Sequence, residues 1–515
     1  MWPPDARDAY NPAHGAIAIG SRLLLLLLRS NNARPGRFVG ARYQAESATR
    51  RNAYLAGAQE LRNGPPAVAP EEQTVANHRA LDRVLGLRDL ILIVIGTVIG
   101  SGIFLVPGGV LRQAGGNAGP ALLVWVVGGG LSLLGALAYG ELGAMNPAAG
   151  GLYVYLRDAF GPLTAFLYGW TFFLVIATGS AATLAVASGS YLQQFVALGP
   201  VGQKLTAVLL LAIVAAINVR STRSSADVQN WSTAIKVGAQ LVMSIVLLVF
   251  RPAAPATAAP FWPASFTPSL LSGMGLGMIG VLWAYEGWQY VTFSAGEAVD
   301  PQRTFPRAIV IGTASLVGIY LFANVGYLAA LGTEGVANSD RVAAEAVSAI
   351  VGPGAAKLIA AVILVSIFSA TNGLTISAPR VYYAMARDGL FFGKLAEVHP
   401  RYGTPAVSII AGTLWAMVLA VSGTFEQLLT YVVFVGWIFY ALGAACVFVL
   451  RRTKPDAERP FRVPGYPWTP MLFIIAAAAL VGNTIATQPG RAAVGIAVVL
   501  LGLPVYFVWH KSQTL

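Results

Sequence analysis

The sequence predicts an all-α integral membrane protein of about twelve transmembrane helices, on three observations. First, 56% of the 515 residues are hydrophobic and only 11% are charged, whereas a soluble domain carries about 25% charged residues. Second, apolar segments follow one another from residue 87 onward, and most are close to the roughly 20 residues that span a bilayer. Third, Lys and Arg cluster between these segments, as they do in cytoplasmic loops.

The expected spans can be placed on the sequence in order. They cover residues 87–111, 120–144, 162–196, 204–218, 229–250, 270–295, 307–331, 355–384, 404–422, 428–450, 468–487 and 491–509. Short amphipathic connectors are expected at 150–159 and 387–396. With the N-terminus inside, the outer loops hold only Arg112, Lys204, Arg251, Arg341, Lys357 and Arg491. Both termini are therefore expected in the cytoplasm, and a plasma (inner) membrane location is expected.

The chain divides into four parts. Residues 80–250 and 268–450 form two predicted halves of five helices each, and residues 466–510 hold helices eleven and twelve. Residues 1–75 are polar and rich in Arg, Ala, Asn and Pro. We expect them to form a disordered cytoplasmic extension, with a regulatory tail as the alternative.

Composition also excludes several classes of function. The net charge of +12 could indicate a nucleic-acid surface, but the basic residues are confined to loops between spans. Cys446 is the one cysteine, so no intrachain disulfide can form, and the four histidines lie outside the apolar spans. No metal, no cofactor and no nucleic-acid partner is expected. No set of catalytic side chains converges in the spans and no phosphate-binding loop is present, so neither an enzyme nor an ATP-driven pump is indicated.

The first span contains the sequence Gly100-Ser101-Gly102. Glycine permits non-helical dihedral angles, so the helix could unwind here and expose backbone N–H and C=O groups. Within a membrane, such groups are tolerated only where they line a cavity or a ligand site. Close helix packing is the alternative, because small residues four apart, such as Gly96 and Gly100, also let helices approach.

The sixth span contains Glu286 beside Gly287. A carboxylate in the middle of a span costs about 2.5–3.5 kcal/mol on insertion scales, so it is usually functional or paired. A purely structural bond to a neighbouring helix is the alternative.

The two breaks fall in the corresponding first helices of the two predicted halves. Paired discontinuities of this kind indicate a transporter built from inverted repeats, with a site at the membrane midplane. Freed amides at the first break would favour a carboxylate, and freed carbonyls at the second would favour an ammonium group. Together they describe an α-amino acid. The predicted substrate-binding residues are Ile99, Gly100, Ser101, Gly102, Ile103, Trp283, Ala284, Tyr285 and Glu286.

The same residues carry a family resemblance. The stretch from Gly96 to Phe104 resembles the first-helix signature of the amino acid–polyamine–organocation permeases. Further similar stretches are Tyr139 to Leu142, Pro147 to Tyr155, Trp283 to Glu297, Asn372 to Gly389 and His399 to Pro405. The match runs in order over about residues 80–450. The sixth helix is most similar to the L-type transporters and their bacterial relatives, in which an aspartate or a small residue is more usual at the position of Glu286.

The resemblance implies a LeuT-type fold of two inverted five-helix repeats and a sodium-independent mechanism. In similar proteins, a lysine at the position of Lys236 takes the place of a sodium ion. It would reach carbonyls of the broken first helix and a hydroxyl on helix eight, where Ser366 and Ser369 are the candidates. Snorkelling of Lys236 to the cytoplasmic face is the alternative. Animal L-type transporters are linked to a partner subunit through an outer-loop cysteine, which the loop at 197–204 lacks.

The expected function is secondary-active amino acid transport by alternating access, as proton symport or exchange. The expected partners are an amino acid substrate, the bilayer and protons, with Trp283 or Tyr285 shielding the site. Glu141 and Glu297 are expected to form ion pairs, with Arg380 and Arg387 as candidate partners. A carrier of polyamines or other organic cations, in which Glu286 would be the counter-charge, is one alternative. A channel or a substrate sensor on the same fold is another.

Overall fold

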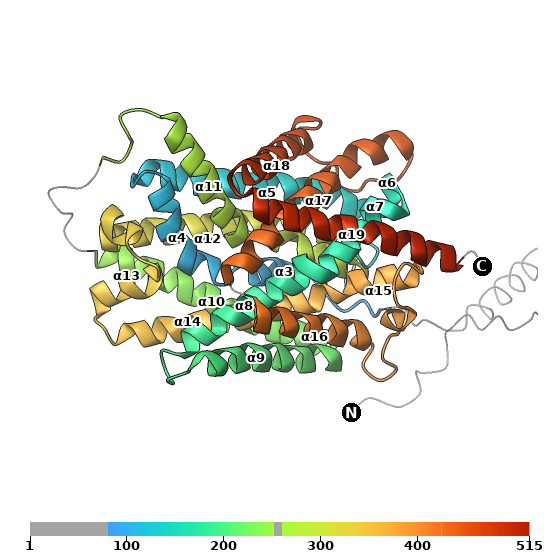
Figure 1. Cartoon of the computed structure of the whole chain (residues 1–515), viewed down its shortest axis with the longest axis horizontal. Helices are drawn as coiled ribbons and strands as arrows, with labels where there is room; N and C mark the ends of the chain where they lie inside the picture. The colour runs from blue at the N-terminus through green and yellow to red at the C-terminus, as the bar shows by residue number, and fades with distance from the viewer. Residues whose placement is uncertain (1–80, 252–259, 424, 514–515) are drawn as a thin grey trace, which may run out of the picture. The chain divides into compact units, whose positions relative to one another are not determined.

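The computed structural model describes residues 81–251, 260–423 and 425–513. Within these ranges the chain is helical (Figure 1), and the one β-type pairing is an isolated bridge between Leu85 and Ala298. The predicted N-terminal extension at 1–75 lies outside the described residues. The predicted all-α class is confirmed.

Ten described helices are long and apolar enough to cross a membrane. Some of these spans are built from two or three successive helical segments. They are α5 (Ala118–Met145), α7 (Pro162–Thr171) with η1 (Phe172–Ile176) and α8 (Ala177–Leu192), α9 (Pro200–Arg220), α10 (Thr222–Val249), α11 (Pro268–Ala284) with η2 (Trp288–Glu297), α12 (Pro301–Ala337), α14 (Ala355–Ser377) with α15 (Pro379–Arg387), α17 (Phe425–Thr453), α18 (Trp468–Thr487) and α19 (Pro489–Gln513).

Two further elements complete the expected set. A bent pair, α3 (Leu87–Val98) and α4 (Gly102–Gln113), passes the same test as one span and turns by 48° at its break. The shorter apolar helix α16 (Ala406–Ser422) lies where the ninth span was expected. The expected count of about twelve is therefore reached. The boundaries of the two five-helix repeats stay a prediction.

The connecting segments differ in part from the expectation. Helix α6 (Leu152–Phe160) lies at the first predicted connector. At the second, α15 has already ended at Arg387 and only the short η3 (Gly393–Ala396) follows. An additional helix, α13 (Val342–Val351), precedes α14.

Helix α10 begins earlier than expected. It was predicted from residue 229 but starts at Thr222, where the Ser221 side chain accepts a hydrogen bond from the backbone of Ser224. A serine at this position stabilises a helix start because it satisfies an otherwise unpaired N–H group. Lys236 consequently lies about four turns inside α10 rather than the two that the sequence suggested.

Helix α3 is a buried element that packs against α10, α12 and α14. Glycines make this close packing possible. A Cβ atom on Gly96 would lie 2.0 Å from Gln229 Nε2, and one on Gly373 would lie 2.4 Å from Thr97 Oγ1. Gly96 therefore serves close helix packing, as the alternative proposed. The helix nevertheless also breaks, three residues further on at Ile99.

Candidate substrate-binding site

The first break lies between α3 and α4. Helix α3 ends at Val98, Ile99 takes a non-helical conformation with φ −70° and ψ 89°, and α4 starts at Gly102. The start of α4 approaches the end of α11 so closely that a Cβ atom on Gly102 would lie 2.7 Å from Ala284 Cα. The sequence Gly-Ser-Gly thus serves two purposes, because it releases the helix and brings the two breaks into contact.

The second break follows α11. The helix ends at Ala284, and the chain passes through Tyr285 and Glu286 to Gly287, which has φ +123°. Residues with a side chain rarely adopt this backbone conformation, whereas glycine does so readily. The chain then continues as the 3-10 helix η2 instead of an α-helix. Gly287 therefore sets the direction in which the second half of the span leaves the break.

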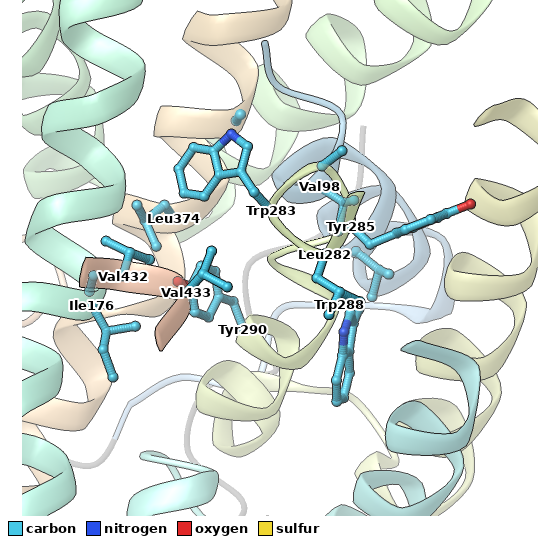
Figure 2. Close-up of a cluster of buried hydrophobic side chains, with 14 of the residues drawn as sticks. Val98, Ile176, Leu282, Trp283, Tyr285, Trp288, Tyr290, Leu374, Val432 and Val433 are labelled. Atoms are coloured by element: carbon cyan, nitrogen blue, oxygen red, sulfur yellow. The ribbon is translucent and has the colours of Figure 1, made fainter. Parts of the chain in front are cut away.

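A small cavity of about 30 Å³ lies between the two breaks. Its walls come from both broken spans and from α8 and α14. The lining residues are Thr97, Val98, Gly100, Ser101, Gly102, Ser180, Leu184, Trp283, Glu286, Tyr290, Ala370 and Leu374. Figure 2 shows four of them, Val98, Trp283, Tyr290 and Leu374, gathered in this region.

The structure brings five of the nine predicted substrate-binding residues to this cavity. They are Gly100, Ser101, Gly102, Trp283 and Glu286. Ile99, Ile103, Ala284 and Tyr285 are buried beside the breaks but do not line it. Tyr285 points away from Trp283 (Figure 2) and packs against Trp125 and Tyr320. The expectation that Tyr285 could shield the site is therefore wrong for this conformation, whereas Trp283 is in position to do so.

Two hydroxyl groups at the first break have no hydrogen-bond partner within the described ranges. They are Thr97 Oγ1 and Ser101 Oγ, both buried. A buried polar group without a partner costs about 1–3 kcal/mol. Because both residues line the cavity, a polar ligand there would supply the missing partners.

Glu286 forms a second polar centre in the cavity wall. Its Oε1 atom accepts hydrogen bonds from Gln289 Nε2 at 2.6 Å, Tyr440 OH at 2.5 Å and Tyr290 OH at 3.3 Å. All three donors approach the same oxygen. The carboxylate is thus fixed in orientation by η2 and α17, while its side chain stays part of the cavity wall.

Lys236 is completely buried. Its Nζ atom donates to the carbonyl oxygens of Gly96 at 2.5 Å and Ile99 at 2.6 Å, at the end of α3. These carbonyls have lost their partners in the helix because the chain unwinds after Val98. The alternative in which Lys236 snorkels to the membrane surface is excluded by this geometry.

Comparison with known proteins identifies the chain. The model of a family described as amino acid permease matches residues 85–508, which is most of the described chain. The chain belongs to the amino acid permease family.

Individual relatives of this permease cover most of its length. The serine/threonine exchanger SteT of Bacillus subtilis is 32% identical over 84% of this chain and 98% of its own. The human large neutral amino acids transporter small subunit 2 is 32% identical over 87% of this chain and 85% of its own. The human cystine/glutamate transporter is 30% identical over 87% of this chain and 90% of its own. None of these relatives favours the polyamine, channel or sensor alternatives.

The two serines of the permease predicted to meet Lys236 are placed differently from each other. Ser366 Oγ donates to the carbonyl oxygens of Ile99 at 2.9 Å and Gly100 at 3.1 Å. Ser369 Oγ instead lies 3.3 Å from Thr233 Oγ1. Lys236 therefore meets helix α14 through a shared acceptor, the Ile99 carbonyl, and not through a hydrogen bond to either serine.

Sequence reasoning missed several cavity residues of the permease. Ser180 and Leu184 on α8, and Ala370 and Leu374 on α14, lie on unbroken helices and have no local signal that distinguishes them from packing residues. Tyr290 could have been found, because it lies one turn after Glu286. Tyr440 is distant in sequence, and only the fold brings it to Glu286.

Ion pairs join the helices of the permease at the end where α3 and α10 begin. Glu297 and Arg380 form a buried two-bond pair, at 2.6 and 2.9 Å, as the sequence suggested. Glu141 pairs instead with Arg451, at 2.6 Å, and with Arg459. Arg387 stacks over the Tyr383 ring, so its predicted role as a partner of these carboxylates is wrong.

The connecting helices are linked at the same end. Arg157 on α6 pairs with Asp388 at 2.6 Å, and Tyr153 OH donates to the same carboxylate at 2.8 Å. Burial, and then the nearby Asp388 charge, raise the pKa of the Tyr153 phenol well above its usual range. Tyr153 therefore stays a hydrogen-bond donor at physiological pH.

Proposed function

We propose that this permease is a sodium-independent secondary-active transporter of α-amino acids that works by alternating access in the plasma membrane, with both termini in the cytoplasm. One observation carries the proposal. An unwound segment with an unpartnered hydroxyl, on Ser101, lines the same cavity as the Glu286 carboxylate. Such a cavity offers hydrogen-bond donors at one wall and a negative group at another, which suits a zwitterion.

The substrate carboxylate would bind at the start of α4. The first N–H groups of a helix have no partner within it and carry a partial positive charge. Here they belong to Gly102 and Ile103, with the Ser101 amide just before them. The Ser101 hydroxyl adds a donor whose partner is missing among the described residues. Ile103 would thus contribute through its backbone, although its side chain is buried away from the cavity.

The substrate ammonium would bind near the end of α11. The Ala284 carbonyl already accepts a hydrogen bond from Tyr320 OH at 2.9 Å, and the Trp283 carbonyl accepts one from the Glu286 amide at 3.0 Å. The Glu286 carboxylate is therefore the stronger candidate for the ammonium group. Charge-assisted hydrogen bonds of this kind are shorter and stronger than neutral ones.

Lys236 would take the place of a sodium ion. A sodium ion is bound by oxygen atoms, and the ammonium of Lys236 already occupies the Gly96 and Ile99 carbonyls. Its charge or its protonation would couple the first span to α14, which reaches the same Ile99 oxygen through Ser366. The bundle of α3–α4, α5, α11–η2 and α12 would rock against the remaining helices.

The names of the relatives support an amino acid as substrate, since each refers to transport of amino acids. A disulfide-linked partner subunit is not part of the proposal. Cys446 is the one cysteine in the sequence, and it is buried in α17.

Uptake of a radiolabelled amino-acid mixture into proteoliposomes tests the proposal. Sodium, a proton gradient and internal amino acids are varied separately, with Lys236→Ala as the variant. We expect uptake without sodium, and its loss by at least tenfold in the variant, because within the membrane the Gly96 carbonyl would lose its Lys236 donor and the Ile99 carbonyl would keep only Ser366.

The remaining conditions separate the possible outcomes. A response to internal substrate indicates exchange, and a response to the proton gradient indicates symport. Uptake that depends on sodium would contradict the role of Lys236 but leave amino acid transport standing. Absence of uptake from folded, inserted protein under every condition would contradict the proposed function.

A further inference from the structure

A second, larger cavity of about 250 Å³ lies between α8, α13 and α14. It is found where α8 ends and α14 begins. Figure 1 shows α13 at the opposite end of the bundle from α15. In the proposed orientation this is the outer end. The cavity belongs to neither helix break and shares no residue with the central cavity.

Tyr191 supplies a buried donor to this cavity. The residue is 5% exposed, and its hydroxyl has no hydrogen-bond partner within the described ranges. Leaving such a group unpaired costs about 1–3 kcal/mol. A ligand that accepts a hydrogen bond from Tyr191 in the cavity would remove this cost.

Two opposite charges line the same cavity. Arg341 caps the start of α13, and Glu345 lies one turn further along. Residues four apart on a helix are neighbours on one face, yet no ion pair of either side chain with another described residue is present. The cavity is thus lined by a cation and an anion on two exposed residues at the start of α13, beside the buried hydroxyl of Tyr191, which has no partner within the described ranges.

We infer that this cavity is a second binding site for an amino acid in its zwitterionic form. The Arg341 guanidinium and the Tyr191 hydroxyl bind the α-carboxylate, and Glu345 binds the α-ammonium. Arginine suits this purpose because its planar N–H groups match the geometry of a carboxylate. The remaining wall consists of small or uncharged residues, namely Gln194, Ala344, Ser348, Pro353, Ala356 and Ala360, so the site selects for the charged groups shared by all amino acids.

The position of the site suggests what it does. Tyr191 follows the central-cavity residue Leu184 on the same helix, about 10 Å further out at 1.5 Å per residue. Helix α14 contributes to both cavities, through Ala360 and Ala370. The outer site therefore collects substrate on the way to the central one. This role rests on the proposed function, whereas binding at the outer site does not.

Equilibrium dialysis with labelled L-alanine tests the inference on the full chain in detergent. The central cavity is first filled by Ala370→Phe, so that remaining binding reports the outer site. We expect this variant to bind one L-alanine per chain. Adding Arg341→Gln weakens that binding at least tenfold, and Glu345→Gln does the same. Propionate and isopropylamine, which each carry one of the two charges, compete at least tenfold more weakly than L-alanine.

Lys357→Gln is the matched control, because Lys357 is an exposed residue on α14 next to the cavity residue Ala356 and does not line the cavity. It removes the same charge and should leave binding unchanged. If Ala370→Phe does not fold, as judged by gel filtration and thermal unfolding, Leu374→Trp fills the same central cavity.

Three results would overturn the inference. One is a folded, filled-cavity variant that binds no L-alanine. Another is binding that Arg341→Gln leaves unchanged, which would indicate a nonspecific site. The third is competition by propionate as strong as that by L-alanine, which would indicate a site for anions alone. Uptake by the unaltered permease is measured in parallel. Uptake without outer-site binding contradicts this inference alone, and outer-site binding without uptake contradicts the proposed function alone.

Discussion

At the scale of single residues, the carbonyl oxygen of Ile99 is the point at which three helices meet. It is released by the unwinding after α3, and it accepts from Lys236 on α10 and from Ser366 on α14. A positive charge and a hydroxyl together satisfy a group that hydrocarbon could not. The deep position of Lys236, about four turns into α10, is explained by this acceptor, which the sequence of α10 alone could not reveal.

Glu286 carries the residue-scale prediction. Glu286→Gln keeps the shape of the side chain and an oxygen for Tyr440 and Gln289 but removes the negative charge. We expect the KM for amino acid uptake to rise about tenfold or more, because a hydrogen bond to a charged group contributes about 1.5–3 kcal/mol. Initial rates of uptake across a substrate series measure this.

Tyr440→Phe is the matched control for that measurement. It removes one donor from Glu286 Oε1 but keeps the carboxylate, so its KM should change less than that of Glu286→Gln. An unchanged KM in Glu286→Gln, with thermal stability reduced, would assign Glu286 a purely structural role.

At the scale of elements, the breaks were predictable and the walls of the cavity were not. Gly100, Gly102 and Gly287 are local signals, because glycine permits non-helical dihedral angles, although it does not force them, as Gly130 inside the continuous helix α5 shows. Ser180 and Ala370 lie on regular helices, and their role depends on which helices α3 and α11 pack against. Five of the nine predicted binding residues reach the cavity, and the other four are buried against neighbouring helices beside the breaks.

The contact between the breaks carries the element-scale prediction. In Gly102→Ala the new Cβ would lie 2.7 Å from the Ala284 backbone, which cannot move aside as a side chain could. Overpacking of this kind costs about 1–3 kcal/mol. We expect a lower midpoint of thermal unfolding in detergent and at least a tenfold loss of uptake.

Gly130→Ala on α5 is the control for this prediction, because a Cβ there meets nothing within 4 Å. Both its unfolding midpoint and its uptake should match those of the unaltered protein. A Gly102→Ala variant that behaves like Gly130→Ala would show that the two breaks are not in close contact.

At the scale of the whole molecule, charged pairs link helices that are far apart in the sequence. Glu297 ends η2 and Arg380 begins α15, while Thr222 at the start of α10 bonds to both side chains. The backbone before α3 joins the same group, because the amides of Val84 and Leu85 donate to the Glu297 carbonyl. Both broken spans are thereby held at one end of the bundle. The sequence of the loops showed that they are charged, but not which charged residues pair.

The pair of Glu297 and Arg380 carries the last prediction, through a double-mutant cycle. Both side chains are almost fully buried, so removing one leaves the other charge unpaired, at a cost of about 3–5 kcal/mol. We expect Glu297→Gln and Arg380→Gln each to lower the midpoint of thermal unfolding strongly. The double variant should lose clearly less than the sum, because it leaves no unpaired charge. Arg223→Gln removes a half-exposed partner of the buried Asp89 and should cost less than either, since solvent reaches the arginine and Asp89 keeps its hydrogen bonds from Asn230 and the Gly86 amide. Additive losses in the cycle would show that the two residues stabilise the fold independently. They would contradict the conclusion that this pair holds the two broken spans together.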